Sequence, residues 1–278
     1  MNIYITQANR QNVIGGGWTF AKNLKKALSG EFNFVDNINE ADLFLISGLT
    51  QTERGEVDIA QKKGIPIVFR VDGLPKPSRN KRMDIKSRLK LYSSIAEVVV
   101  YQSEWSKEYL GYYCGDGMVI YNGVDTKLFS KNGEFLPKER KVYLYVNHSS
   151  NINKRFEEAK YIFQRKAKSE DCELWLVGRF DESFNYDLID CEKVRNFGVV
   201  ENREELAKIY RSADTLIYPS FADSCPNVVL EALASGLDMI GLNGEGGTME
   251  LMRLNDISVD RMAREYATLF NFLIKEKV

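Results

Sequence analysis

The sequence of 278 residues is poor in the residue types from which metal and redox sites are built. It contains one histidine, His148, and four cysteines that form no Cys-x-x-Cys pair. A zinc site is therefore not expected, and the cysteines are interpreted as reduced thiols. No apolar run approaches the roughly 18 residues that a membrane span requires. Residues 1–6 are predicted to form a strand and not a signal peptide, so we expect a cytoplasmic protein.

The charge balance argues against one class of partner. Lys and Arg total 38 against 39 Asp and Glu, which gives a formal net charge of −1. Bulk electrostatics therefore gives no reason to expect nucleic-acid binding. An apolar fraction of 44% with 28% charged residues is ordinary for a soluble globular protein, and the length suits one large domain or two of moderate size.

Short apolar runs alternate with longer amphipathic segments along the chain. Strands are predicted at 2–6, 32–35, 43–47, 66–71, 97–101, 118–121, 141–146, 173–177, 194–197, 215–218 and 239–242. Helices are predicted at 17–28, 52–63, 79–92, 106–110, 156–168, 203–212, 226–235 and 259–275. This alternation, with nearly continuous apolar strands, is typical of parallel sheets that are covered on both faces.

A polar segment at 130–140, which contains Asn132-Gly133, interrupts the alternation. We therefore expect an α/β fold of two Rossmann-like domains, 1–130 and 140–258, followed by a C-terminal helix at 259–278. Ligands of open α/β sheets bind beyond the carboxyl ends of the strands. Two such domains that face each other would place a site in the cleft between them.

The most informative segment is 215–236, where a short apolar strand passes through a polar turn into a helix. The helix has Pro226 near its first turn and Gly236 at its end, which is the usual placement of these two residues. Asp223 lies in the turn and Glu231 inside the helix, with seven residues between them. Two isolated carboxylates would be interpreted as a helix cap and a solvated helix residue. With the free amides of a helix N-terminus, they would suit a ligand that combines hydroxyls with phosphates.

The residues around these carboxylates resemble the signature of glycosyltransferase family 4, the group 1 glycosyl transferases. The matching positions are Pro219, Ser220, Pro226, Glu231, Ala232, Ala234 and Gly236. Asp223 stands where the family has a first glutamate. The resemblance implies a retaining GT-B glycosyltransferase, whose two Rossmann-like domains face each other across a cleft.

The resemblance also implies roles for individual residues around the nucleotide-sugar donor. Glu231 would hold the ribose hydroxyls, and Asp223 would hold the hydroxyls of the sugar. The backbone that follows would assist Asp223 through the amides of the segment Ser224, Cys225, Pro226 and Asn227. Backbone groups near Val199, in a Phe197-Gly198-Val199-Val200 segment that also matches the family, would contact the base.

Three glycines, Gly15, Gly16 and Gly17, lie between the first predicted strand and the first helix. Without side chains, their amides could approach a phosphate closely at the positive end of that helix. The alternative is an ordinary flexible loop. In the family a glycine pair in this loop faces the donor phosphates and the acceptor, and Gly15-Gly16 is the matching pair.

Cations are expected after the strand at 141–146. In the family this turn carries an arginine and a lysine–glycine pair that clamp the donor diphosphate. Lys154 matches the lysine, His148 falls at the arginine, and Arg155 replaces the glycine. Cations are required to neutralise a departing diphosphate. Whether His148 or Arg155 supplies the second one stays open.

Asp72-Gly73 follows the fourth predicted strand, where many family members have His-Asp. Asp72 could contact a sugar hydroxyl, act on the acceptor, or start a turn before Gly73. A loop after a central strand faces the ligand, which favours a functional role. Further support for the resemblance comes from the segment 121–125, Tyr-Asn-Gly-Val-Asp, which is similar to a family Ile-x-Asn-Gly-Val-Asp.

Residues 76–90 contain seven basic side chains against one acid, Asp84. One interpretation is a solvated helix face. The other is a patch that meets an anionic membrane surface, which would make the protein peripheral at a membrane, or a phosphate-bearing acceptor.

The sequence thus predicts a hexosyltransferase-like enzyme of glycan biosynthesis. Its substrates would be a nucleotide-diphosphate sugar and a sugar, lipid-linked or protein acceptor. No Asp-x-Asp motif is present, so that no metal is expected, and no cofactor is expected either. The alternatives are a sugar-nucleotide epimerase or hydrolase on the same fold, and a non-catalytic sugar-nucleotide-binding subunit.

Overall fold

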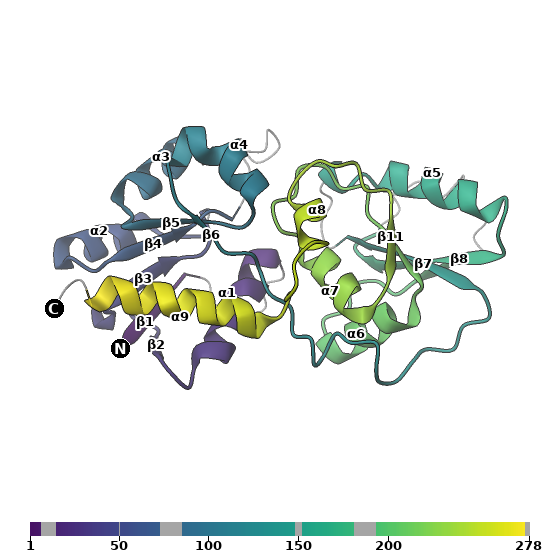
Figure 1. Ribbon diagram of the computed structural model, residues 1–278, viewed down its shortest axis with the longest axis horizontal. Helices are drawn as coiled ribbons and strands as arrows, with labels where there is room; N and C mark the ends of the chain where they lie inside the picture. The colour runs from purple at the N-terminus through teal and green to yellow at the C-terminus, as the bar shows by residue number, and fades with distance from the viewer. Residues whose placement is uncertain (7–14, 50, 73–84, 148–151, 181–192, 276–278) are drawn as a thin grey trace. The chain divides into compact units, whose positions relative to one another are not determined.

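The computed structural model describes residues 1–6, 15–49, 51–72, 85–147, 152–180 and 193–275 (Figure 1). The chain forms two compact units. Unit 1 consists of Met1–Gly123 together with Asn255–Val278, and unit 2 is Val124–Leu254. The domains expected from the sequence are 1–130 and 140–258, followed by a separate helix. In the structure, the segment 124–140 lies in unit 2 and the last helix lies in unit 1.

Unit 1 contains a six-stranded parallel sheet with the strand order β2-β1-β3-β4-β5-β6. Its strands are β1 (Asn2–Ile5), β2 (Asn33–Val35), β3 (Leu43–Ile46), β4 (Ile67–Arg70), β5 (Val98–Tyr101) and β6 (Met118–Val119). Its helices are α1 (Gly16–Leu28), η1 (Ile38–Glu40), α2 (Arg54–Lys63), α3 (Ile85–Ile95), α4 (Glu104–Cys114) and α9 (Val259–Lys275). The parallel arrangement confirms the strand–helix alternation that the sequence predicts.

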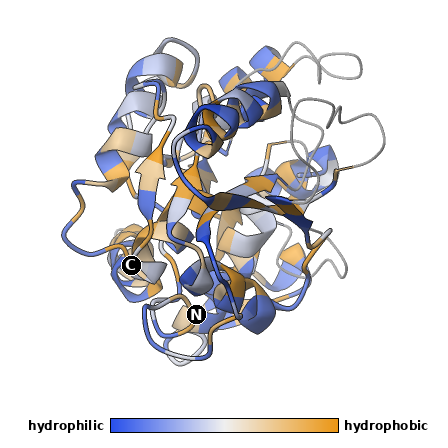
Figure 2. Ribbon diagram, turned by 90° about the vertical axis from the view of Figure 1, so that its right-hand side faces the viewer, coloured by the Kyte–Doolittle hydropathy of each residue, from blue (hydrophilic) through white to orange (hydrophobic). Residues whose placement is uncertain are grey.

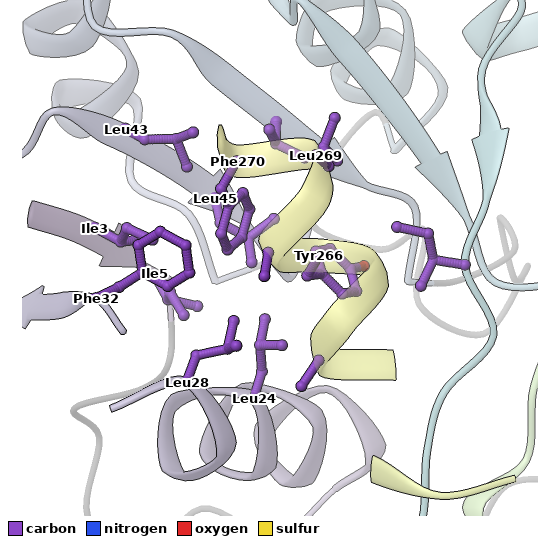
Figure 3. Close-up of a cluster of buried hydrophobic side chains, with 14 of the residues drawn as sticks. Ile3, Ile5, Leu24, Leu28, Phe32, Leu43, Leu45, Tyr266, Leu269 and Phe270 are labelled. Carbon is purple, nitrogen blue, oxygen red and sulfur yellow. The ribbon is translucent and has the colours of Figure 1, made fainter. Parts of the chain in front are cut away.

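Both faces of this sheet are buried, because successive side chains of a strand point to opposite faces. Leu43 and Leu45 of β3 pack with α1 and α9, whereas Phe44 and Ile46 pack with α2, α3 and α4. Figure 3 shows the first of these two clusters, in which Tyr266 and Phe270 of α9 lie among the aliphatic side chains of β1, β3 and α1. The C-terminal helix is therefore part of the core of unit 1.

Unit 2 contains a five-stranded parallel sheet with the order β11-β10-β7-β8-β9. Its strands are β7 (Lys141–Asn147), β8 (Cys172–Gly178), β9 (Val194–Asn196), β10 (Thr215–Ile217) and β11 (Asp238–Ile240). Its helices are η3 (Ile152–Lys154), α5 (Phe156–Ala167), α6 (Arg203–Ser212), α7 (Asn227–Ser235) and α8 (Thr248–Leu251). The short elements η1, η3 and α8 were not predicted from the sequence.

The helices of unit 2 cover its sheet on both sides, with α5 on one face and α6 and α7 on the other (Figure 1). Tyr143, Tyr145 and Leu174 point toward α5 and form one apolar cluster with Phe156 and Phe163. Figure 2 shows several strands in orange, whereas the helices carry both blue and orange residues. This is the expected pattern for amphipathic helices on a buried sheet.

Candidate active site

The candidate residues of unit 2 lie where its parallel strands end. The central strands β7 and β10 are neighbours in the sheet, so the turns that follow them emerge at the same edge. The turn after β7 leads through η3 to Lys154 and Arg155, and the turn after β10 carries Asp223. The backbone joins the two turns, because the Phe221 N–H donates to the Asn153 carbonyl at 2.8 Å.

Lys154 and Asp223 form an ion pair at this edge. The Lys154 Nζ lies 2.6 Å from Asp223 Oδ2, and the two side chains are 19% and 31% exposed. The Tyr218 hydroxyl donates to the same carboxylate oxygen at 3.0 Å and accepts from Lys154 Nζ at 3.4 Å. The pair is therefore held on its inner side by a buried phenol and open to solvent on its outer side.

Burial raises the pKa of Tyr218 well above its usual value, and the neighbouring Asp223 carboxylate raises it further. Tyr218 consequently stays protonated throughout the neutral range. Its hydroxyl can therefore donate to Asp223 at any pH at which the protein functions.

Arg155 occupies a strained backbone position beside this pair. It is the N-cap residue of α5 and has φ 51, in the left-handed region that favours glycine. In the family that the sequence resembles, glycine stands at this position. The Arg155 guanidinium donates to Glu158 at 3.0 Å and lies 5.2 Å from the ring centroid of Phe221, which is 40% exposed.

The segment after Asp223 opens α7. Pro226 is its N-cap residue, and Asn227 is its first helical residue. Ser224 and Cys225 are buried, whereas Asn227 is partly exposed. Because proline has no N–H group, Pro226 cannot contribute an amide to a ligand, and this part of the expectation for the segment is wrong. The remaining amides at this N-terminus are of the kind that bind anions and hydroxyls.

Glu231 lies inside α7 and is 4% exposed. It forms an ion pair with Arg203, the first residue of α6, at 2.7 Å. The Arg203 guanidinium also lies over the ring of Phe129, 4.7 Å from its centroid. Burial together with the Glu231 carboxylate raises the pKa of the neighbouring Tyr210 well above its usual value. The buried Glu231 carboxylate is therefore paired with a guanidinium that is partly exposed.

The other predicted positions are distributed over both units. Val199 follows β9 and is 38% exposed. In unit 1, Gly15 is the N-cap residue of α1, while Gly16 and Gly17 belong to its first turn. Asp72 follows β4 and accepts a hydrogen bond from the Leu49 N–H at 3.1 Å. His148 and Gly73 lie outside the described residues.

The structure thus brings Lys154, Arg155 and Asp223 to one edge of a single sheet. Gly15, Gly16, Gly17 and Asp72 belong to unit 1. Sequence reasoning missed Tyr218, Arg203 and Phe221. The only signal for Tyr218 was its place at the end of an apolar run before Pro219, which also suits an ordinary core tyrosine.

Part of the basic segment 76–90 is described. Ile85, Leu89 and Tyr92 of α3 are buried. Lys86 and Lys90 are exposed and lie over the rings of Tyr113 and Tyr112 of α4. In the described part, Lys86 and Lys90 thus lie on the exposed face of an amphipathic helix, which fits both interpretations, and residues 73–84 lie outside the described residues.

Two absences hold for the described part of the chain. No group of three or more His, Cys, Asp or Glu side chains is arranged so that it could hold a metal ion. None of the described helices combines the length and the apolar character that crossing a bilayer requires.

Comparison with known proteins connects this geometry with a class of enzymes. A sucrose-phosphate synthase from Thermosynechococcus elongatus is similar to this chain with a TM-score of 0.75 at 15% identity, over 99% of both chains. HepE from Anabaena, in complex with UDP, is similar with a TM-score of 0.68 at 14% identity, over 97% of this chain and 90% of that chain. A glycosyltransferase from Rickettsia africae follows with a TM-score of 0.62 at 15% identity, over 98% and 88%. The two-sheet α/β fold is therefore that of the GT-B glycosyltransferases.

Residues 140–275 match the family described as glycosyl transferases group 1. Within the GT-B class, the second half of the chain is therefore similar to this family. The comparison with curated proteins gives no match.

Proposed function

We propose that this protein transfers a sugar from a nucleotide-diphosphate donor to an acceptor with retention of anomeric configuration. The observation that carries the proposal is the partly exposed Lys154–Asp223 pair at the edge of the unit 2 sheet, next to the N-terminus of α7. A cation, a carboxylate and free helix amides at one place suit a ligand that carries both phosphates and hydroxyls. The match of residues 140–275 to the group 1 glycosyl transferases supports the same assignment.

In this proposal the two charged pairs of unit 2 bind different parts of the donor. Lys154 contacts the diphosphate: its ammonium has three N–H groups, and two of them have partners in Asp223 and Tyr218. Asp223 accepts hydrogen bonds from the sugar hydroxyls. Glu231, oriented by Arg203, accepts from the ribose hydroxyls, and Val199 lies against the base.

Bond cleavage leaves negative charge on the departing diphosphate, which a preorganised cation stabilises. Lys154 supplies that cation. Arg155 supplies a second cation in this proposal. Its guanidinium lies over the ring of Phe221, and Phe221 belongs to the same turn as Asp223. The bond between the anomeric carbon and the phosphate oxygen breaks as the acceptor oxygen attacks from the same face, and the acceptor proton passes to a phosphate oxygen.

The donor is proposed to carry a uridine diphosphate. Two structures of HepE, at 14% and 15% identity to this chain, contain UDP and UDP-glucose. The reaction as proposed uses the nucleotide sugar as a substrate and needs neither a cofactor nor a metal. The acceptor would be a sugar, a lipid-linked sugar or a protein, and the proposed location is cytoplasmic.

The test incubates the purified protein with UDP-, GDP- and ADP-sugars, and records thermal shifts together with release of free nucleoside diphosphate. We expect one donor to raise the melting temperature and to release diphosphate slowly by hydrolysis. The Lys154→Met variant should be stabilised by the same nucleotide with release strongly reduced.

Stabilisation without release, even when a mixture of simple sugar acceptors is added, would favour a binding subunit over a transferase. If no donor stabilises the protein, the proposed function is wrong. Product stereochemistry, measured by NMR at the anomeric proton, tests retention separately.

A further inference from the structure

The loop at 241–247, between β11 and α8, lies against the turn that carries Asp223. Gly246 pairs with Asp223 in an isolated parallel β-bridge. The Gly247 N–H also donates to the Asp223 carbonyl at 2.9 Å. The backbone of Asp223 is thus held by this loop, whereas its carboxylate is held by Lys154 and Tyr218.

Asn243 joins the same loop to the start of the turn. Its amide nitrogen donates to the Pro219 carbonyl at 3.3 Å and to the Ser220 carbonyl at 3.1 Å. Its amide oxygen accepts from the Glu245 N–H at 3.0 Å. One side chain therefore fixes the shape of the 241–247 loop and the position of the turn together.

The contact between Gly246 and Asp223 leaves no room for a side chain. A Cβ at Gly246 would lie 2.5 Å from the Asp223 carbonyl oxygen and 2.8 Å from its nitrogen. Gly246 has φ +86, a conformation that favours glycine. Gly244, two residues earlier in the same loop, has φ +76, but a Cβ there would meet nothing within 4 Å.

The turn itself is under backbone strain next to Asp223. Ala222 has φ 53, so a residue with a Cβ is held in the left-handed region directly before the carboxylate. Strained residues of this kind persist only where the surrounding structure fixes them, and they concentrate at functional sites. The 241–247 loop supplies part of that constraint.

We infer that Gly246 and Asn243 are positioning residues for Asp223, and that they act on recognition of the donor sugar and not of the nucleotide. This inference rests on the proposed function, in which Asp223 holds the sugar hydroxyls and Glu231 holds the ribose. Moving the Asp223 backbone displaces the carboxylate from the sugar. The contacts of Glu231 with the nucleoside come from α6 and α7 and stay in place.

The test compares Gly246→Ala with Gly244→Ala in the whole protein. Both variants place a Cβ on a left-handed backbone of the same loop, but only Gly246→Ala places it against Asp223. Calorimetric titrations with UDP-glucose and with UDP measure the affinity for the donor with and without its sugar. We expect Gly246→Ala to weaken UDP-glucose binding about tenfold, through misplacement of a contact group, and UDP binding less than about twofold. Gly244→Ala should change neither affinity by more than about twofold.

A double-mutant cycle with Asp223→Asn shows whether the effect passes through Asp223. If it does, adding Gly246→Ala to Asp223→Asn weakens UDP-glucose binding no further. Fully additive losses would overturn the inference. Equal effects of the two alanine variants, or parallel losses for UDP and UDP-glucose, would overturn it as well.

Asn243→Asp keeps the inference testable if Gly246→Ala does not fold. The aspartate keeps the size of the side chain and the acceptor for Glu245, but removes the donor to Pro219 and Ser220. It should give the same selective loss of UDP-glucose affinity, and an unchanged ratio of the two affinities would contradict the inference. A wild-type protein that binds no nucleotide sugar would refute the proposed function and the positioning role together. Normal binding with indistinguishable variants would refute the positioning role alone.

Discussion

Both units contain a parallel sheet with charged or polar groups beyond its central strands, but these groups are arranged in different ways. In unit 2, Lys154 pairs with Asp223 and Arg203 with Glu231, and at least one member of each pair is partly exposed. In unit 1, Arg70 at the end of β4 is 1% exposed and donates to the neutral oxygens of Ser47, Gln102 and Asn122.

The difference separates a ligand site from a structural cluster. A partly exposed ion pair can exchange one partner for a ligand, because water and ligand reach it. The guanidinium of Arg70 lies 3.8 Å from the ring centroid of Phe20, inside the molecule. A buried charge whose donors reach fixed acceptors connects strands and does not bind a substrate. Arg70 therefore joins β3, β4, β5 and the chain at Asn122.

Lys154→Met provides the largest expected effect on the unit 2 side of this comparison. Loss of one preorganised group that stabilises developing charge costs on the order of 10²–10³ in kcat. Steady-state kinetics with the identified donor measures the change. Lys141→Met is the matched control. Lys141 is the first residue of β7, at the end of the strand away from Lys154, and it forms an ion pair with Glu170. A control variant as slow as Lys154→Met would contradict the assignment.

Glu231→Gln should reduce binding and leave the fold intact. The amide keeps the shape of the carboxylate and can still accept from Arg203. A hydrogen bond to a charged group contributes about 1.5–3 kcal/mol, so the Kd for the nucleoside diphosphate should rise by roughly 10–100-fold. Calorimetry measures the Kd, and Glu204→Gln, an exposed residue in the first turn of α6, serves as the control. An unchanged Kd would show that Glu231 is purely structural.

Arg70→Met tests the unit 1 side. The variant removes the Arg70 donors from the buried side-chain oxygens of Gln102 and Asn122, which should lower the free energy of unfolding by about 1–3 kcal/mol. Urea unfolding measures this loss, and donor affinity at low denaturant should stay unchanged. Arg54→Met, at an exposed position of α2, should be nearly neutral. A variant with normal stability but weakened donor binding would place Arg70 in the site and remove the contrast between the units.

The smallest expected effect concerns pH. Burial raises the pKa of Tyr145, Tyr210 and Tyr218 above the ordinary value of 10.0. Because the folded-state pKa lies above the unfolded one, their contribution to stability is complete below about pH 10 and is lost as pH rises further. Absorbance at 295 nm should show these phenols ionising only together with unfolding. Complete tyrosine ionisation in the folded protein would contradict their burial.

Most of the fold could be predicted from the sequence because each element is locally encoded. The prediction for α6 agrees with the structure at both ends, where Asn202 caps the N-terminus by accepting from the Glu204 and Glu205 N–H groups. The prediction for α9 agrees at both ends as well. The short elements η3 and α8 were missed, since three or four residues carry too little periodicity to be recognised.

The candidate site was predictable residue by residue, but its contacts were not. The sequence placed Lys154 and Asp223 after separate strands, and the rule for parallel sheets placed both at one edge. Their ion pair spans 69 positions of the chain, and Tyr218 joins it from the strand end. The partner of Glu231 is Arg203 on another helix, 28 positions away. Pairings at such distances depend on how helices pack against the sheet.

The sequence by itself determined the strand–helix alternation, the parallel sheets and the resemblance to a known family. Those properties follow from apolar periodicity, from helix caps and from a short motif, all of which are local. Only the tertiary structure decided that α9 completes the core of unit 1, and that a phenol and an ammonium share the Asp223 carboxylate. It alone decided that the 241–247 loop pairs with the backbone of Asp223. These features depend on close packing between distant segments, where a single Cβ at Gly246 would already collide with Asp223.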